Sequence, residues 1–270
     1  MEIKRNGKKV VALLCSLIMI FAFAVPNFAA NSSTTKTVYV DVEKNITGQN
    51  VIQEPVKVVL DENKTIADAT KEAVGANRVR IRSTQYGNYI EAFKDDTLPF
   101  IPEENYEFYD ELYELTDGIV FRTDIPNQPI VNEEGWLAEK EYNGISGWMF
   151  TVDNTMVDAN NVYYTGDTKL SDLPDNAVIR WEYSMAVGCD IGLEGYLPNG
   201  TLNEWGYYNW NTEPTPPFFN TRVDKSELIR KMADHENKNS AEYLEAMKVL
   251  RDLTTEEYTQ ADVDEIADSL

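Results

Sequence analysis

Apolar and polar residues alternate along several short segments in the first part of the chain. The alternation is clearest in TVYVDVE at 37–43, in EPVKVVLDE at 54–62 and in RVRIRS at 78–83. Such alternation is typical of a β-strand that buries one face and leaves the other polar. Each of these segments is therefore predicted to form a strand.

Two further strands, both rich in aromatic residues, are predicted near the middle of the chain. YNGISGWMFTVDNTMVD at 142–158 contains the first, and AVIRWEYSM at 177–185 forms the second. Residues two apart share one face of a strand, so Arg180 and Glu182 point away from the aromatic side. The shared apolar face is expected to carry Trp148, Phe150, Val152, Ile179, Trp181 and Tyr183.

A helix is predicted between the early and the later strands. Thr65 is followed three residues on by Asp68, which is the spacing of a capping box at a helix start. Because the apolar aromatic face needs a cover, we expect this helix to pack on it. The predicted fold class is α+β, with a β-grasp-like mixed sheet on one helix over residues 36–192.

Two segments follow neither the strand pattern nor the helix pattern. At about 86–134, several prolines enclose EENYEFYDELYEL, in which Tyr106, Tyr109 and Tyr113 recur at helical spacing. We interpret this segment as an insertion that carries one amphipathic helix. Residues 193–222 are aromatic and Pro-rich, and are interpreted as an extended connector.

Residues 223–270 have the apolar spacing of three helices. Thr259 and Asp262 form a second capping box, at the start of the last helix. The apolar stripes are Leu228, Ile229 and Met232, then Leu244, Met247, Val249 and Leu250, then Val263, Ile266, Ala267 and Leu270. We predict a small three-helix bundle that forms a separate unit.

The start of the chain has the pattern of a secretory signal peptide at residues 1–30. Lys4, Arg5, Lys8 and Lys9 precede an apolar run that ends in small residues. Cys15 lies inside that run without the small-residue box of a lipoprotein, so a lipid anchor is not expected. No later segment is apolar enough to span a membrane. The expected location is therefore extracellular, either secreted or associated with the cell surface.

The net charge limits the partners that this protein can bind. The chain carries a formal net charge of −22, and loss of the basic signal peptide would make it more negative. Nucleic acid and anionic lipid would both be repelled. We therefore predict no nucleic-acid partner.

The residues needed for common catalytic and metal sites are not gathered in any known pattern. His235 is the single histidine, and Cys189 is the single cysteine beyond the signal peptide. Ile66 occupies the position at which a calcium loop starting at Asp61 needs glycine. No phosphate loop or dinucleotide fingerprint is present. The sequence predicts a protein that is not an enzyme and holds no metal.

The aromatic strands and the turn after them resemble a known family. Gly147, Trp148, Met149 and Phe150, then Trp181 and Tyr183, then Gly188, Asp190 and Gly192 resemble the transcobalamin-like C-terminal domain family of exported bacterial proteins. Two turns depart from the family pattern, because Asp153–Asn154 and Asp175–Asn176 replace turns that contain glycine. Asn tolerates the left-handed backbone that Gly would supply, so we expect the fold to be kept.

The resemblance implies a β-grasp fold and a place at the surface of a Gram-positive bacterium. In vertebrate vitamin B12 carriers this module caps the corrin ring, so the resemblance also implies a corrinoid (cobalamin) ligand. Residues 223–270 are similar to the FIVAR modules of cell-surface proteins, which implies surface architecture for the C-terminal helices.

A ligand site is predicted around the first aromatic strand. A flat, partly apolar macrocycle would need aromatic faces and a few hydrogen-bond donors. The candidate ligand-binding residues are Tyr142, Asn143, Ser146, Trp148, Trp181 and Tyr183. Packing in the core of the sheet explains Trp148, Phe150, Trp181 and Tyr183 as well, and both interpretations stay open.

Three functions therefore compete. The first is an exported module that binds a small molecule, with a corrinoid as the candidate. The second is an adhesion or scaffold component that binds cell-surface proteins and no small molecule. The third is glycan binding, by stacking on Trp205, Tyr207, Tyr208 and Trp210 if these rings are exposed.

Overall fold

The computed structural model describes residues 34–47, 51–85, 87–95, 134–204, 208–218, 222–252 and 258–270. Residues Thr35–Leu270 form one compact unit. The predicted signal peptide at 1–30 lies outside the described residues. So do Tyr106, Tyr109 and Tyr113 of the predicted insertion.

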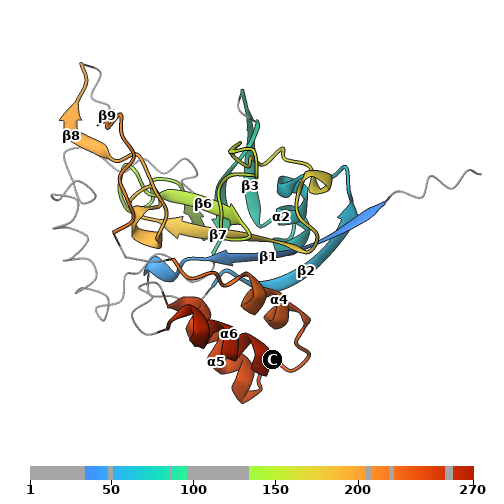
Figure 1. Ribbon diagram of the computed structural model, residues 1–270. Coiled ribbons are helices and arrows are strands. Elements are labelled where there is room, and N and C mark those ends of the chain that lie inside the picture. Colours follow the sequence, from blue (N-terminus) through green and yellow to red (C-terminus); the bar gives the residue numbers. More distant parts are fainter. Residues whose placement is uncertain are drawn as a thin grey trace, which may run out of the picture. The chain divides into compact units, whose positions relative to one another are not determined.

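A four-stranded mixed sheet lies at the centre of this unit (Figure 1). Its strands are β1 (Thr35–Glu43), β2 (Gln53–Asp61), β6 (Gly147–Val152) and β7 (Ala177–Ser184), in the order β2-β1-β7-β6. β1 runs parallel to β7, while the β1–β2 and β6–β7 pairs are antiparallel. The predicted α+β class is confirmed, and the narrower β-grasp assignment stays a prediction.

One face of the sheet is apolar and is covered by α2 (Ile66–Val74). The helix starts at Thr65 with the predicted capping box, in which Asp68 N donates to Thr65 Oγ1 at 3.2 Å. Val38, Val40 and Val42 of β1 belong to the same buried cluster as the apolar residues of α2. The predicted cover for the apolar face is therefore confirmed.

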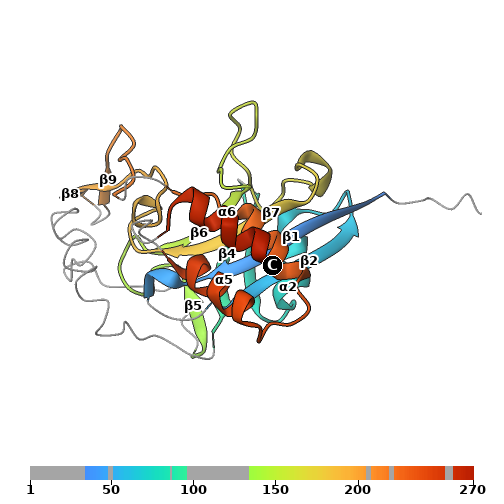
Figure 2. The ribbon, with the colours of Figure 1, turned by 60° about the horizontal axis from the view of Figure 1, so that its bottom comes forward.

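The other face of the sheet is covered by α4 (Ser226–Asp234), α5 (Ala241–Arg251) and α6 (Gln260–Ser269) (Figures 1 and 2). Their buried residues share one hydrophobic cluster with Tyr39 of β1 and Val178 of β7. The three predicted helices are thus present. They were expected to form a separate unit, but they bury part of the sheet and belong to the same compact unit.

The apolar stripe predicted for α5 needs one correction. Leu244 is 53% exposed, whereas Tyr243 and Ala246 are buried with Val249 and Leu250. The buried side of α5 is therefore rotated away from Leu244. The stripes of α4 and α6 keep their predicted buried residues Leu228, Ile229, Met232, Val263 and Ala267.

A second sheet has the order β3-β4-β5, with β3 (Val79–Thr84), β4 (Gly87–Lys94) and β5 (Trp136–Ala138). Residues 87–94 had been assigned to the irregular insertion, but they form a regular strand paired with β3. Phe93 of β4 contacts Trp148, with ring centroids 4.7 Å apart. The second sheet therefore extends the apolar core of the first.

The segment predicted as a connector also contains regular structure. β8 (Pro198–Leu202) and β9 (Tyr208–Trp210) pair in an antiparallel hairpin. Gly195 and Thr215 form a β-bridge, and Phe218 N donates to Cys189 O at 3.0 Å. This segment folds back on the turn after β7.

The two turns that lack glycine adopt the expected backbone. Asp153 and Asn154 have φ of 44° and 65°, and Asn176 has φ of 58°. These angles lie in the left-handed region, which Asn tolerates better than most residues. The substitution of Asn for Gly therefore keeps both turns, as predicted.

Candidate functional site

Three of the predicted ligand-binding residues are rings buried in the core. Trp148, Trp181 and Tyr183 are each at most 5% exposed. Trp148 Nε1 donates to Leu137 O at 3.0 Å, and Trp181 Nε1 donates to Thr70 Oγ1 at 3.0 Å. The Tyr183 hydroxyl donates to Ala138 O at 2.8 Å. Each polar atom thus has a partner inside the protein, as packing in the core requires.

The other three predicted residues belong to the loop at 142–146. Asn143 Nδ2 donates to Met185 O at 3.0 Å, and Asn143 Oδ1 accepts from Ile145 N at 2.8 Å. Ser146 Oγ lies 3.0 Å from the Tyr183 hydroxyl. Burial raises the pKa of the half-buried Tyr142 above its ordinary value, with a contribution from the Asp95 carboxylate. Asn143 and Ser146 hold this loop against the core.

A large cleft lies beside β6, with a volume of about 1290 Å³. It is lined by the β3–β4 hairpin, the edge of β6, the loop at 163–166, the turn residue Val187, residues 194–196 and Trp210 of β9. The rings that line it are Tyr89, Trp148, Phe150, Tyr163, Tyr164, Trp181, Tyr196 and Trp210. Charged side chains also line it, namely Arg82, Glu139, Lys140 and Glu194.

The cleft includes two of the six predicted site residues. Trp148 and Trp181 contribute to its wall, whereas Tyr142, Asn143, Ser146 and Tyr183 are not among its lining residues. Two of the predicted residues therefore line the cleft, and the other four lie behind its wall. The hydrogen bonds of the loop at 142–146 fix the end of β6 that carries Trp148.

Most of the exposed rings in the cleft were not predicted from the sequence. Tyr163 is 62% exposed, Trp210 is 48% exposed and Tyr196 is 47% exposed. Trp210 had been named as a possible glycan contact, while Trp205, Tyr207 and the side chain of Tyr208 lie outside the described part of the chain. Tyr163 and Tyr196 stand in segments without period, so no pattern had singled them out.

Two glycines determine how closely the loops approach the cleft. A Cβ at Gly166 would lie 2.1 Å from the carbonyl oxygen of Asn88, and a Cβ at Gly195 would lie 2.2 Å from the carbonyl oxygen of Val187. Any other residue would force these loops outward. The loop around Gly166 is also held by Asn88 Nδ2, which donates to Asp167 Oδ1 at 2.5 Å.

A tyrosine hydroxyl and a guanidinium can supply polar contacts in the cleft. Burial, followed by the charge of Glu139, raises the pKa of Tyr89 above its ordinary value, so its hydroxyl stays protonated. The Arg82 guanidinium lies 5.8 Å from the centre of the Tyr89 ring and pairs with Glu91. The site is therefore a mainly aromatic cleft with a few polar groups.

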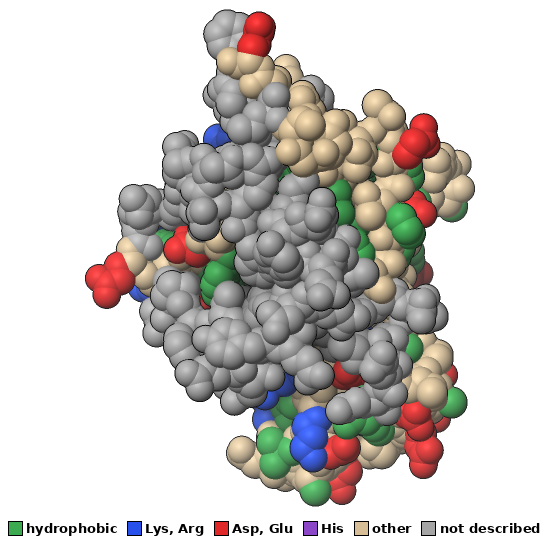
Figure 3. All heavy atoms as spheres, turned by 90° about the vertical axis from the view of Figure 1, so that its left-hand side faces the viewer, with side chains coloured by type: hydrophobic (Ala, Val, Ile, Leu, Met, Phe, Trp, Pro, Cys, Tyr) green, Lys and Arg blue, Asp and Glu red, His purple; other side chains and the backbone are tan. Residues whose placement is uncertain are grey.

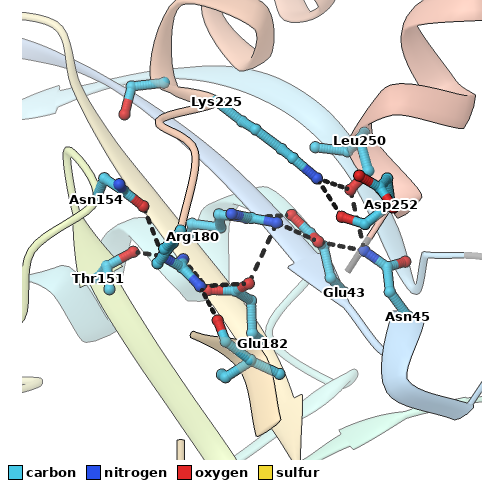
Figure 4. Close-up of polar contacts among 12 residues, drawn as sticks. Glu43, Asn45, Thr151, Asn154, Arg180, Glu182, Lys225, Leu250 and Asp252 are labelled. Atoms are coloured by element: carbon cyan, nitrogen blue, oxygen red, sulfur yellow. Dashed lines mark hydrogen bonds and ion pairs between the residues drawn. The ribbon is translucent and has the colours of Figure 1, made fainter. Parts of the chain in front are cut away.

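A second polar feature lies on the opposite face of the sheet, under the C-terminal helices (Figure 4). Glu43 of β1 accepts two hydrogen bonds from Arg180 of β7, at 2.6 and 2.9 Å. Arg180 also pairs with Glu182 at 3.2 Å, and Glu182 pairs with Arg222. Arg180 and Glu182 are 5% and 3% exposed. Their expected direction away from the aromatic face is confirmed, but that direction is the protein interior.

Lys225 and Asn45 connect this charged cluster to the end of α5. Lys225 Nζ donates to Leu250 O at 3.1 Å and also to Asp252 O, while Asn45 Nδ2 donates to Leu250 O at 3.2 Å. These bonds satisfy carbonyl groups that the helix end leaves without partners. The charged residues therefore help to attach the C-terminal helices to the sheet.

Burial changes the protonation of several groups in this cluster. Burial, then the charge of Arg180, lowers the pKa of Lys225 to about 7. Burial and the charge of Glu43 raise the pKa of Asp41 well above its ordinary value. Burial alone would raise the pKa of Glu43, but the charge and hydrogen bonds of Arg180 hold it below its ordinary value. Asp41 is thus the carboxyl of this cluster that can keep a proton.

The single histidine and cysteine have structural surroundings. Burial raises the pKa of the Cys189 thiol to about 12, so it is not a thiolate at neutral pH. The His235 ring stacks on Tyr243, and Nε2 lies 3.1 Å from Ser240 Oγ. Within the described ranges, no three His, Cys, Asp or Glu side chains gather as a metal site.

The surface of the molecule is acidic, and its described helices are short or polar. Figure 3 shows acidic side chains at several separate places on one side of the molecule, in agreement with the net charge of −22. Among the helices that the structure describes, none combines the length and the hydropathy needed to cross a membrane.

Comparisons of the chain with protein-family models, with curated proteins and with solved structures find no match.

Proposed function

We propose that this protein is an exported, non-catalytic binding protein whose ligand occupies the aromatic cleft beside β6. The main support for this proposal is the cleft, which has a volume of about 1290 Å³ and walls that include several exposed rings. Ligand sites are typically concave and mainly apolar, with a few polar groups that orient the ligand. The basic and apolar start of the chain supports export.

The size and lining of the cleft favour a large, flat ligand. Typical small-molecule pockets measure roughly 300–1,000 Å³, so this cleft exceeds the usual range. Rings such as Tyr163 and Trp210 can stack on a flat face, while Arg82 and the Tyr89 hydroxyl can contact polar groups at its rim. A corrinoid has these properties, and the family resemblance of the aromatic strands makes it the first candidate.

The test is a titration of residues 31–270 with cobalamin and with cobinamide, followed by corrin absorbance and tryptophan quenching. Tyr163→Ala should weaken binding about tenfold, because the loss of one stacking ring costs about 1.4 kcal/mol. Leu244→Ala is the matched control, since Leu244 is 53% exposed, close to the 62% of Tyr163, but lies on α5. If binding does not saturate at a corrinoid concentration of roughly 100 µM, the corrinoid is excluded, because a dissociation constant above this value is too weak for a specific site.

Glycan binding is the second candidate, and the exposure of Tyr196 and Trp210 favours it. Sugars stack on exposed rings, and buried rings cannot take part. Replacement of Trp210 by Ala should then abolish binding to a glycan array, while Leu244→Ala keeps it. An array without signal for the unchanged protein would rule out this candidate.

A further inference from the structure

The outer edge of β6 carries backbone groups that the sheet does not use. β6 lies at the end of the strand order β2-β1-β7-β6, so one of its edges has no strand beside it among the described strands. Such an edge presents N–H and C=O groups that can pair with another chain. Which groups are open follows from the register of β6 with β7.

The register assigns alternate residues of β6 to its two edges. Asp153 N donates to Val178 O at 3.0 Å, which marks this pair as hydrogen-bonded. In an antiparallel ladder the hydrogen-bonded pairs alternate with pairs that are not bonded to each other. Thr151 and Met149, opposite Arg180 and Glu182, therefore bond to β7. The N–H and C=O groups of Trp148 and Phe150 point to the open edge.

Both ends of this edge are already occupied. Ser146 O accepts from Lys140 N at 2.8 Å, and Val152 N donates to Thr155 O at 2.8 Å. Both groups point to the same side as those of Trp148 and Phe150, as the alternation requires. Between these two contacts, no described residue bonds to the backbone of Trp148 or Phe150. Within the described part of the chain, the open stretch of this edge is thus two outward-facing residues long.

This open part faces the aromatic cleft. Trp148, Met149 and Phe150 all line the cleft, although successive side chains of a strand point to opposite faces. Three successive lining residues mean that the strand presents its edge to the cleft. The groups of Trp148 and Phe150 therefore open into a cavity with ring walls, where a partner with a polypeptide backbone could pair with them and place its side chains against the rings.

We propose that an extended peptide of a partner protein binds in this cleft by adding a strand to the edge of β6. In this mode of recognition the backbone hydrogen bonds give affinity and the flanking pockets select alternate side chains. Tyr163, Tyr196 and Trp210 are exposed rings suited to apolar or aromatic side chains. The net charge of −22 repels acidic segments, so the peptide is neutral or basic.

This proposal goes beyond the binding of a small molecule and does not depend on it. A peptide would bond to the backbone of β6 as well as contact the rings, whereas a corrinoid or a glycan would use the rings without pairing as a strand. For a partner protein at the cell surface, it specifies one mode of binding, which is the addition of a strand. Cobalamin titration and peptide binding are separate measurements, so either proposal can fail while the other holds.

The test is a selection of random peptides of about eight residues, displayed on phage, against residues 31–270. Enriched peptides are synthesised, and hydrogen exchange of the protein amides is measured by NMR with and without each peptide. The Trp148 and Phe150 amides should exchange quickly in the free protein and at least about tenfold more slowly in the complex. The Met149 and Thr151 amides, which bond to β7, are the internal control and should stay unchanged.

N-methylation of the peptide supplies a second control. Methyl groups on alternate residues along the bonding edge should abolish binding, while the same number on the other edge should leave it intact, because an added strand uses one edge. The proposal is overturned if no peptide is enriched above background, or if Trp148 and Phe150 are already protected in the free protein. It is equally overturned if an enriched peptide binds without slowing these two amides.

Discussion

The two faces of the central sheet are made by the same strands, but they are stabilised in different ways. On the α2 side, Val38, Val40 and Val42 pack with Ile179, Trp181 and Tyr183 in an apolar cluster. On the side of the C-terminal helices, Tyr39 and Val178 are apolar, but Asp41, Glu43, Arg180 and Glu182 are buried beside them.

A polar strand face is therefore not always exposed to solvent. Alternation along β7 separates Arg180 and Glu182 from the aromatic residues, and it does not reveal what covers them. The C-terminal helices exclude water from this face, so each charge needs a partner within the protein. Arg180, Glu43, Glu182 and Arg222 supply one another with such partners.

The largest effect is expected from removal of the central cation. Arg180→Met would leave Glu43 without the two hydrogen bonds that the guanidinium donates, and breaking a buried ion pair costs about 3–5 kcal/mol. Urea unfolding of both proteins measures this loss. Arg82→Met is the control, because Arg82 is 53% exposed and solvent screens its pair with Glu91, so the loss should be much smaller. Equal losses in both variants would show that water reaches the charged face.

A smaller effect is expected on the apolar face. Trp181→Phe removes part of a buried ring and the hydrogen bond to Thr70, and should lower the free energy of unfolding by about 2 kcal/mol. Thr70→Val keeps the ring and removes the acceptor, together with the hydrogen bond that Thr70 Oγ1 donates to Ile66 O within α2. It therefore tests the polar contribution separately from the ring and should cost about 1 kcal/mol. If Thr70→Val is as harmful as Trp181→Phe, packing of the larger ring contributes little.

The elements with a strong local pattern could be predicted from the sequence. The early strands, the helix capped by Thr65 and the final helix capped by Thr259 follow from alternation and from capping chemistry. β4 was missed because its alternation continues directly into a Pro-rich segment. The docking of the C-terminal helices was missed because it depends on contacts between residues far apart in the chain, such as Tyr39 and Asp234 at 3.0 Å.

The candidate site could be predicted only in part, for a similar reason. Trp148 and Trp181 were found because they alternate within strands, and the structure places both at the wall of the cleft. Tyr163 and Tyr196 reach the cleft from irregular loops, and Trp210 reaches it from the short strand β9. The course of these segments depends on close contacts such as that of Gly166 with Asn88. Side chains brought together by such contacts have no periodic signal in the sequence.

The smallest effect is expected from the lysine that joins the charged face to the helices. The pKa of Lys225 is about 7 in the folded protein and about 10.4 in an unfolded chain, so the unfolded state binds more protons between these values. Stability should therefore rise with pH, by about 1 kcal/mol from pH 7 to about pH 8. Arg180, Glu43, Asp252 and Glu182 all act on this amine.

Lys225→Met should lack this rise, and the difference between the two unfolding curves isolates the lysine from Asp41 and the other titrating groups. Lys248→Met is the matched control, because Lys248 is 67% exposed and the Glu245 carboxylate raises its pKa. A raised pKa contributes stability that is lost only at still higher pH. The same slope in wild type and Lys225→Met would show that Lys225 stays charged in the folded protein. In that case Lys225 would add no pH dependence to the face under the C-terminal helices. That face would then differ from the apolar face through its buried ion pairs and not through its response to pH.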